Sequence, residues 1–301
     1  MATQELQPFE QLGLIGCGLM GGSFALALKK AGLVKRVVGY SKSPSTTERA
    51  RQMGVIDVEA PSALLAAAGA DLVLLAVPVA ATEATLKSIK HLVTPQMMIM
   101  DVGSTKVDVV QAARSALRDQ IGSFVPAHPI TGKEVAGVEH ADVKLYQGAQ
   151  VVLTPTERTL TAHLAKAQAL WQALGCKVTA MSPEAHDSAL ATVSHLPHLL
   201  AFAYFQAITE QPTARDLLSL AGPGFRDFTR IAGGDPAVWR DVLLANKREV
   251  LAQSQRFRAA LDRLEALMDD GDGSALEAAL KPIAEGRNAW QPSSGNNNTS
   301  P

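Results

Sequence analysis

The first 180 residues alternate short apolar runs with stretches of helical periodicity, and this alternation limits the possible folds most strongly. Several runs are continuous in Val, Ile and Leu, which is typical of strands covered on both faces. Strands and helices in alternation predict an α/β fold with a doubly wound parallel sheet. The expected strands are Leu12–Gly16, Arg36–Tyr40, Leu72–Val77, Met97–Asp101, Phe124–Ala127, Gln150–Thr154 and Lys177–Ala180. The expected helices between them are Met20–Lys30, Thr46–Met53, Val79–His91, Lys106–Leu117 and Thr159–Leu174.

The strand pattern stops near residue 182, and the following part of the chain is predicted to be all helical. Ser182, Pro183 and Glu184 form a strong helix start, with a capping serine, a proline in the first turn and an acid favoured by the helix dipole. A helix over Pro236–Met268 would be about 50 Å long at ~1.5 Å per residue, which predicts burial against a second subunit. The expected helices are Pro183–Thr209, Thr213–Leu220, Phe225–Ala232, Pro236–Met268 and Ser274–Arg287.

A glycine-rich loop with the sequence GCGLMG joins the first expected strand to the first helix. Gly16 permits the tight turn, Gly18 lets the backbone approach a pyrophosphate, and Gly21 lets the helix pack closely on the strand. Leu19 and Met20 open the helix, whose free N–H groups attract phosphates. The loop predicts a Rossmann-like dinucleotide-binding site, and a glycine turn without a ligand is the alternative.

The end of the second expected strand bears on the choice of dinucleotide. An NAD site usually carries Asp or Glu at this point to bind the ribose hydroxyls. This chain has Ser41 instead, followed by Lys42 and Ser43, with Thr46 close by. A cation with hydroxyl groups suits a 2′-phosphate, so NADP is favoured and NAD is the alternative.

More polar motifs follow the carboxyl ends of the expected strands, where open sheets bind their ligands. Val77 and Pro78 end the third strand and are expected beside the cofactor. The sequences DVGSTK at 101–106 and AHPITGKE at 127–134 follow the next two strands. The helical half adds SHLPH at 194–198 and GPGFRDFTR at 222–230.

In this order the motifs resemble the prephenate/arogenate (cyclohexadienyl) dehydrogenase family, from about Leu12 to Trp290. The resemblance implies oxidative decarboxylation of prephenate to 4-hydroxyphenylpyruvate, or of arogenate to tyrosine, with hydride transfer to NAD(P) in tyrosine biosynthesis. It also implies a homodimer formed by the helical domain. We expect a dinucleotide-binding domain at 1–182, a helical substrate and dimerisation domain at 183–290, and a disordered tail at 291–301.

The resemblance assigns the chemistry to His128 and Ser104. His128 matches the histidine that accepts the proton of the substrate hydroxyl, and an imidazole with a pKa of about 6.5 suits this role near neutrality. Ser104 matches a serine that holds the hydroxyl and the cofactor. Loss of the ring carboxylate as CO2 yields an aromatic phenol, so no metal is required. The alternatives are a structural histidine before a proline turn and a serine that caps a helix.

The substrate carries carboxylates, which call for cations in the pocket. Arg230 matches the family's carboxylate-binding arginine, and its planar fork suits bidentate contact. His195 and His198, one helical turn apart, resemble a pair that contacts substrate, although each is also a candidate for simple packing. Asp227 is expected to orient Arg230 or its neighbours. Trp239 is expected either to line the pocket across the dimer or to lie in the core.

Lys133 departs from the family, in which a small hydroxyl residue often follows the glycine of this motif. A cation beside the substrate's side chain would favour the keto acid prephenate over arogenate, whose ammonium it would repel. This argument requires that Lys133 neither pairs with Glu134 nor points outward.

Two other functions stay open at this point. The β-hydroxyacid dehydrogenases share the glycine loop and a helical second half, but they carry a catalytic lysine four residues before a helical asparagine. Here Asn246 instead precedes Lys247. A non-catalytic NADP-binding sensor would bind nucleotide without turnover, and it would leave His128, Ser104 and Arg230 unexplained.

Composition and charge exclude several classes of partner. A net charge of −1 without a long basic run gives no general field for nucleic acid or an anionic membrane. Cys17 and Cys176 lie far apart and in no metal-like spacing, which fits a reducing compartment. No export signal is recognised at the N-terminus, and no apolar run reaches the roughly 18 to 20 residues of a membrane span. We therefore expect a cytoplasmic protein whose partners are a small-molecule substrate and a second copy of itself.

Overall fold

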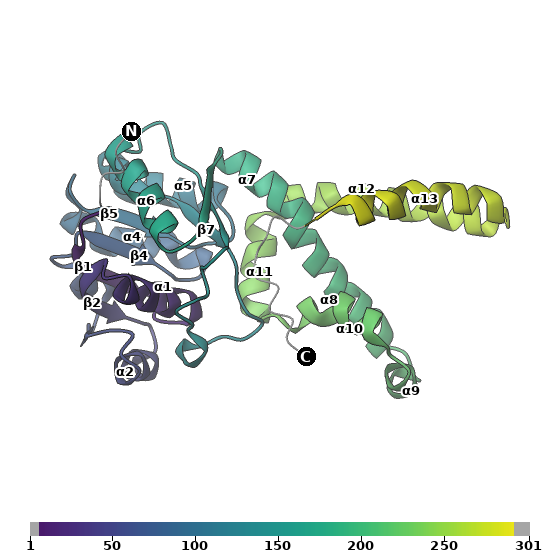
Figure 1. Cartoon of the computed structure of the whole chain (residues 1–301), viewed down its shortest axis with the longest axis horizontal. Helices are drawn as coiled ribbons and strands as arrows, with labels where there is room; N and C mark the ends of the chain where they lie inside the picture. The colour runs from purple at the N-terminus through teal and green to yellow at the C-terminus, as the bar shows by residue number, and fades with distance from the viewer. Residues whose placement is uncertain (1–5, 292–301) are drawn as a thin grey trace.

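The computed structural model describes residues 6–291, which form an α/β part followed by a helical part (Figure 1). The α/β part contains a six-stranded, fully parallel sheet in the order β3-β2-β1-β4-β5-β6. This order reverses between β1 and β4, and the crevice at that point is where open sheets bind their ligands. The strands are β1 (Phe9–Ile15), β2 (Val34–Tyr40), β3 (Val58–Glu59), β4 (Leu72–Leu75), β5 (Met98–Asp101) and β6 (Phe124–Val125).

Helices cover both faces of this sheet, which confirms the doubly wound arrangement. On one face the core is centred on the aromatic rings of Phe24 and Trp171, whose centroids lie 5.0 Å apart. On the other face α3, α4 and α5 pack with buried aliphatic residues such as Leu86 and Val109. The helices are α1 (Leu19–Lys30), α2 (Pro44–Gln52), α3 (Ala63–Ala67), α4 (Thr82–Ile89), α5 (Val107–Leu117) and α6 (Thr161–Ala173).

The expected strand over Phe124–Ala127 is wrong, because the chain leaves the first sheet at Pro126. Proline has no N–H to donate to a neighbouring strand. The next residues form β7 (Ala127–Ile130), which pairs antiparallel with β8 (Gln150–Leu153); β8 pairs parallel with β9 (Lys177–Ala180). The prediction of a single parallel sheet therefore fails after β6, and the second sheet carries His128.

The helical part begins at α7 (Pro183–Leu190), where the Ser182 side chain accepts from the Ala185 N–H at 3.1 Å. A π-helical segment, η5 (Ala191–His195), interrupts the helix expected over Pro183–Thr209. Pro197 explains it, because a proline cannot donate to the carbonyl one turn earlier and the turn widens. The remaining helices are α8 (Leu196–Thr209), α9 (Ala214–Ser219), α10 (Pro223–Thr229), the 3-10 segment η6 (Arg230–Gly233), α11 (Pro236–Ala245), α12 (Lys247–Asp269) and α13 (Gly273–Ala289).

The long helix expected over Pro236–Met268 is wrong, because the chain breaks at Asn246. Asn246 has backbone angles of φ −102° and ψ 25°, outside the helical region. Its buried side chain donates to the backbone carbonyl of Asp187 at 2.7 Å. That tertiary hydrogen bond holds the break, so α11 and α12 take separate directions.

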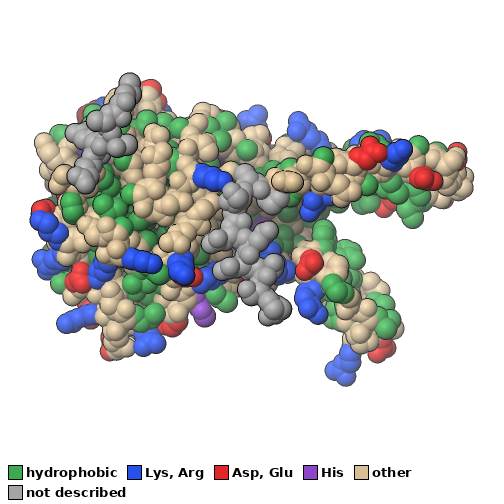
Figure 2. Space-filling model, in the orientation of Figure 1, with side chains coloured by type: hydrophobic (Ala, Val, Ile, Leu, Met, Phe, Trp, Pro, Cys, Tyr) green, Lys and Arg blue, Asp and Glu red, His purple; other side chains and the backbone are tan. Residues whose placement is uncertain are grey.

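Helices α12 and α13 run away from the rest of the molecule as a pair (Figure 1), and apolar side chains are visible along them in Figure 2. Such a contiguous apolar surface is rare on a monomer. The exposed large apolar residues of this pair are Leu251, Phe257, Leu261, Met268, Leu280 and Ile283.

Between residues 6 and 291, no helix is long and apolar enough to cross a membrane. Apart from Gln291, the tail expected at 291–301 lies outside the described residues.

Candidate active site

The glycine loop has the geometry of a phosphate-binding turn. Gly16 has a φ of +101°, and a Cβ atom there would collide with the carbonyl of Ala76. A Cβ atom on Gly21 would collide with the carbonyl of Gly16. Gly18, by contrast, caps α1 without a side-chain hydrogen bond, and a Cβ atom there would meet nothing within 4 Å. The loop therefore leaves open space in front of unpaired helix N–H groups, as a dinucleotide pyrophosphate requires.

The predicted ribose-binding residues follow β2 beside this loop. The Ser41 hydroxyl accepts from the backbone N–H of Cys17 at 2.8 Å, so it is tied to the glycine loop. Lys42 and Ser43 are exposed, and Thr46 lies half-buried in the first turn of α2. Within residues 6–291, the ammonium of Lys42 has no hydrogen bond or ion pair. This edge therefore presents a free cation and hydroxyl groups.

Val77 is half-buried and Pro78 is exposed, directly after β4. The preceding residue, Ala76, donates its N–H to the carbonyl of Ile15 at 2.8 Å and touches the glycine loop. The structure thus brings Val77 and Pro78 to the same sheet edge as the phosphate-binding turn.

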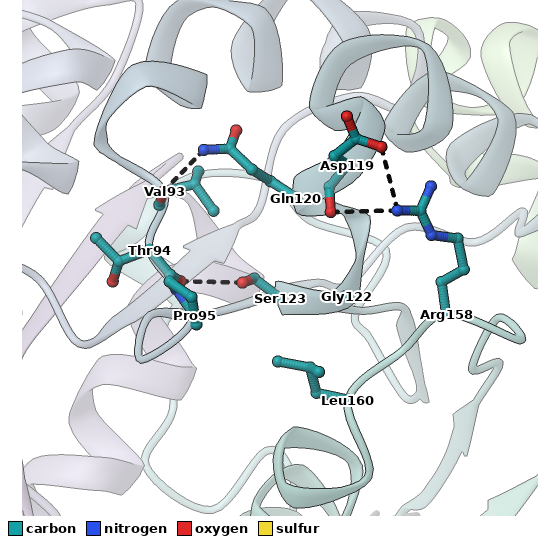
Figure 3. A pocket seen from close by; sticks show the side chains of 9 residues that line it. All are labelled: Val93, Thr94, Pro95, Asp119, Gln120, Gly122, Ser123, Arg158 and Leu160. Atoms are coloured by element: carbon teal, nitrogen blue, oxygen red, sulfur yellow. Dashed lines mark hydrogen bonds and ion pairs between the residues drawn. The ribbon is translucent and has the colours of Figure 1, made fainter.

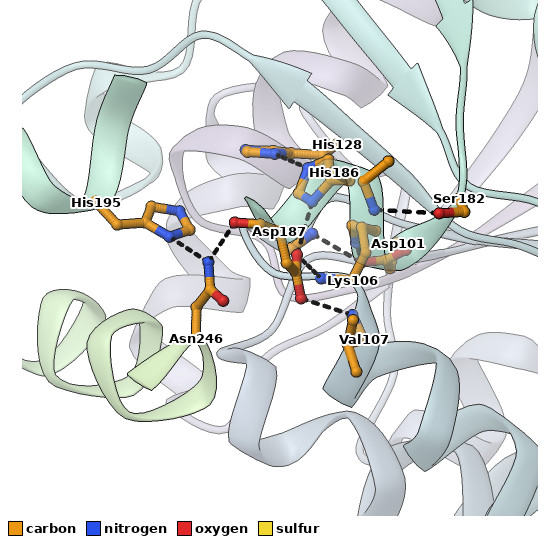
Figure 4. Close-up of polar contacts among 11 residues, drawn as sticks. Asp101, Lys106, Val107, His128, Ser182, His186, Asp187, His195 and Asn246 are labelled. Carbon is orange, nitrogen blue, oxygen red and sulfur yellow. Dashed lines mark hydrogen bonds and ion pairs between the residues drawn. The ribbon is translucent and has the colours of Figure 1, made fainter. Parts of the chain in front are cut away.

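His128 lies on β7 with its ring buried (Figure 4). Its Nδ1 is 2.8 Å from Nε2 of His186 on α7, and the Nδ1 of His186 is 2.7 Å from the Oδ1 of Asp187. Burial lowers the pKa of His128 well below its usual range, and the positive charges possible on His186, Lys106 and His195 lower it further. The ring is therefore neutral near pH 7, and its Nε2 has no partner among the described residues.

Asp187 joins the two halves of the molecule. Its carboxylate accepts from the backbone N–H groups of Lys106 and Val107 at 2.8 and 2.9 Å, and so caps α5 from the helical part. Burial alone would raise the pKa of Asp187, but the hydrogen bonds from His186 and from these two N–H groups outweigh burial and lower it. Asp187 is therefore an ionised, fixed carboxylate behind the histidines.

A buried ion pair between Lys106 and Asp101 locks the strand ends around this cluster. The Asp101 carboxylate also accepts from the backbone N–H groups of Gly103 at 2.8 Å and Ala127 at 3.0 Å. The ends of β5, β7 and α5 are thereby fixed relative to one another. Removing one partner would leave an uncompensated buried charge, at a cost of about 3–5 kcal/mol.

His195 is held by Asn246. The Asn246 amide nitrogen donates to the Asp187 carbonyl at 2.7 Å and lies 3.0 Å from Nδ1 of His195. A carbonyl can only accept, so the amide orientation is fixed and Nδ1 of His195 is the acceptor. Burial lowers the pKa of His195 to about 4, against the opposing effects of Asp187 and the Ser104 carbonyl. The neutral ring therefore carries its proton on Nε2, which is buried near the Ser104 carbonyl and makes no well-formed hydrogen bond among the described residues.

Ser104 lies half-buried in the loop between β5 and α5, beside His195. The alternative role as a helix cap is wrong, because the N-cap position of α5 is Lys106 and the cap is supplied by Asp187. The Ser104 hydroxyl has no hydrogen bond to any described residue, so it is available to a ligand.

His198 and Trp239 stack on each other, with ring centroids 3.5 Å apart and planes 21° apart. His195 meets the same indole edge-on at 6.3 Å. Trp239, expected either to line the pocket across the dimer or to lie in the core, is half-buried and contacts both histidines of its own chain. His198 donates from Nδ1 to the carbonyl of Ser194 at 2.9 Å, and burial lowers the pKa of His198.

Arg230, in η6, forms an ion pair with Glu134 from the loop after β7. This contact brings the sheet part and the helical part together at the site. Asp227 was expected to orient Arg230 or its neighbours; it is exposed, and no ion pair joins it to Arg230 in the described chain. The ammonium of Lys133 lies 3.2 Å from the carboxylate of Asp142 and donates to the backbone carbonyl of His140 at 3.3 Å. Lys133 is therefore paired within its own loop, and the argument from Lys133 for prephenate no longer stands.

A separate pocket of about 330 Å³, shown in Figure 3, is lined by none of these residues. It is lined by residues such as Pro95 and Ser123, which precede β5 and β6, and Arg158 and Asp119 form an ion pair beside it. The pocket therefore lies at the amino ends of the strands, opposite the edge that binds cofactors in this class of fold.

Comparison with known proteins decides the family. Residues 24–180 match the nucleotide-binding domain of prephenate dehydrogenase, and residues 182–282 match its dimerization domain. The chain belongs to the prephenate dehydrogenase family. The resemblance drawn from the motifs is confirmed, as are the fold class and the prediction of a nicotinamide-dependent oxidoreductase.

Individual relatives agree with this family. The chain is 34% identical to a Bacillus subtilis prephenate dehydrogenase over 276 residues, covering 91% of this chain and 74% of the relative. It is 32% identical to a Zymomonas mobilis cyclohexadienyl dehydrogenase over 281 residues, which cover 93% of this chain and 95% of the relative.

Two solved structures in the family are also similar. The prephenate dehydrogenase of A. aeolicus in complex with hydroxyphenyl propionate and NAD+ has a TM-score of 0.86 and 35% identity, covering 92% of this chain and 97% of that one. The Synechocystis arogenate dehydrogenase has a TM-score of 0.78 and 29% identity, and the match covers 93% of this chain and 100% of that one. The β-hydroxyacid alternative is thereby set aside, and Val242 stands where its catalytic lysine would be, four residues before Asn246.

The motif analysis missed several residues of this prephenate dehydrogenase family site. His186 and Asp187 follow the recognised helix start at Ser182, and an adjacent His and Asp in a first helical turn was an available signal. Asn246 had no usable signal, since its role depends on a residue 59 positions away. Glu134 lay within a quoted motif but received no role.

Proposed function

We propose that this chain oxidises and decarboxylates prephenate, arogenate or both. The observation that carries the proposal is His128: a buried, neutral imidazole with a free Nε2, located where the two halves of the site meet. The named substrates and complexes of the relatives support the same reaction class.

His128 is the general base of the proposed reaction. Its Nε2 takes the hydroxyl proton as the carbinol carbon loses hydride and becomes a carbonyl. A bound nicotinamide supplies the hydride acceptor. The bond between the ring and its carboxylate then breaks, and the released electron pair makes the ring aromatic with negative charge on the oxygen. His128 returns its proton to that oxygen, so the products are a phenol and CO2.

The neighbouring groups divide the work of binding. Neutral His195 offers an N–H donor from Nε2, while the Ser104 hydroxyl can donate or accept. Arg230 supplies the positive charge for a substrate carboxylate, which must then replace Glu134 as its partner. His198 and Trp239 form one wall of the binding site.

NADP is the proposed cofactor, with NAD as the alternative. Ser41 cannot repel a 2′-phosphate, and the free ammonium of Lys42 can pair with one. The A. aeolicus relative, however, is described with NAD+. We also propose a homodimer, supported by the match to a dimerization domain and by the exposed apolar residues of α12 and α13. A cytoplasmic location stays a prediction from sequence.

Spectrophotometry at 340 nm tests the proposal, with prephenate and arogenate each supplied with NAD and with NADP. Turnover of at least one pair supports it, and the ratio of kcat/KM values decides substrate and cofactor. Nucleotide binding without turnover of either substrate would overturn it in favour of a non-catalytic sensor.

A further inference from the structure

We propose that His186 and Asp187 are positioning residues that fix the tautomer of His128 and share the proton it accepts. The proposal rests on the proposed function of His128. It begins from two hydrogen bonds in series, His128 to His186 at 2.8 Å and His186 to Asp187 at 2.7 Å, within a buried cluster (Figure 4).

The Asp187 carboxylate determines which nitrogen of each histidine in this series carries a proton. An ionised Asp187 can only accept, so Nδ1 of His186 carries a proton. In neutral His186 the other nitrogen, Nε2, is then an acceptor. His128 must therefore donate from Nδ1, which leaves its Nε2 unprotonated and free to act as a base.

The surroundings keep Asp187 ionised and in place. The backbone N–H groups of Lys106 and Val107 donate to its two oxygens, and the N-terminus of α5 favours a negative charge there. The ammonium of Lys106 is already paired with Asp101, so it does not compete for Asp187. The remaining titratable group near His128 is His195, whose Nδ1 faces Asn246.

The same series offers a path for the proton. When Nε2 of His128 takes the hydroxyl proton, the proton on its Nδ1 can move to Nε2 of His186. The positive charge then lies on His186, in contact with the Asp187 carboxylate. The reverse movement restores the proton to Nδ1 of His128, and Nε2 then returns the hydroxyl proton to the phenol oxygen, so no external acid or base is consumed.

Asp187→Asn removes the negative charge that fixes the series. The amide NH2 group must oppose the N–H of either Lys106 or Val107, so a protonated His186 loses its counter-charge and the tautomer of His128 is no longer held. We expect kcat to fall by about 10²- to 10⁴-fold at pH 7 while KM changes by less than about threefold. Asp57→Asn is the matched control, since Asp57 also accepts a backbone N–H, from Val37 at 2.7 Å, but lies remote from the site.

His186→Gln provides a second variant. The glutamine oxygen can still accept from Nδ1 of His128 and preserve its tautomer, but it cannot take up a proton. We expect a smaller fall in kcat, of about tenfold, with KM nearly unchanged. His163→Gln is the control, because His163 is another buried histidine, bonded to the carbonyl of Pro95 at the opposite edge. A His186→Gln variant as active as the wild type would overturn the proton-sharing part of the proposal.

Nitrogen-15 NMR of histidine-labelled protein tests the tautomers without any turnover. The His128 signals are identified by their absence in a His128→Asn variant. We expect an Nδ1–H tautomer for His128 in the wild type and a mixture of the two tautomers in Asp187→Asn. An Nε2–H tautomer in the wild type would overturn the proposal. If the wild type turns over neither substrate, the proposed function fails, and the NMR result still decides the tautomer question.

Discussion

Gly18→Ala separates cofactor binding from folding more cleanly than any other change in the glycine loop. The backbone at Gly18 is extended, with a φ of −73°, so alanine is tolerated there without strain. A Cβ atom would meet no protein atom within 4 Å. It would instead enter the space that a pyrophosphate is expected to occupy beside the helix N–H groups.

The size of the effect follows from the hydrogen bonds at stake. Moving the pyrophosphate away from one helix N–H loses one charged hydrogen bond, of about 1.5–3 kcal/mol. This energy corresponds to a rise in the cofactor Kd of about 10- to 150-fold. The midpoint of thermal unfolding without cofactor should stay unchanged, because no contact within the protein is altered.

Calorimetric titration with NADP and with NAD measures the effect on Kd. Gly286→Ala, in α13, is the matched control, since a Cβ atom there also meets nothing within 4 Å and the site is remote. An unchanged Kd in Gly18→Ala would refute the placement of the pyrophosphate at this loop. Gly21→Ala should behave differently and lower stability, because its Cβ atom collides with the Gly16 carbonyl.

Three further predictions concern the chemistry and its specificity. His128→Asn should lower kcat by about 10²- to 10⁴-fold and leave the cofactor Kd unchanged. In the wild type, burial lowers the pKa of His128, and only the neutral imidazole accepts a proton. The acid limb of the pH profile of kcat/KM should therefore lie below about pH 6.5. Arg230→Ala should raise the substrate KM by about 10- to 100-fold, whereas Arg158→Ala, which breaks a surface ion pair at the opposite sheet edge, should leave KM unchanged; an effect on cofactor affinity alone would show that Arg230 is wrongly placed. Ser41→Asp should shift the kcat/KM ratio toward NAD by about tenfold, the effect of ~1.4 kcal/mol of repulsion, and an unaltered ratio would remove the argument for NADP.

Local patterns were sufficient for the elements that position the cofactor. The apolar run at Leu72–Leu75 and the glycines at 16, 18 and 21 act through their immediate neighbours, so their roles can be read from short stretches of sequence. The break after β6 was also readable, because Pro126 removes a hydrogen-bond donor in the middle of an expected strand.

The catalytic surroundings depend on contacts between distant residues, which periodicity does not encode. Asp187 caps a helix that begins 80 residues earlier, and Asn246 ends a helix by bonding to the carbonyl of Asp187. Asp227, three residues before Arg230, was expected to orient Arg230 or its neighbours, but the ion-pair partner of Arg230 is Glu134, 96 residues away in sequence. Residues close in sequence are the natural first guess for an ion-pair partner, whereas the fold brings Glu134 of the α/β part into contact with Arg230 of the helical part.

The central claim is that His128 faces the reacting hydroxyl beside the nicotinamide. A crystal structure of this chain with NADP+ or NAD+ and hydroxyphenyl propionate tests it directly. The account predicts Nε2 of His128 within about 2.6–3.2 Å of the phenol oxygen, with Nδ1 still bonded to His186. An imidazole turned away from the bound ring, or beyond hydrogen-bond reach of its oxygen, would contradict the account.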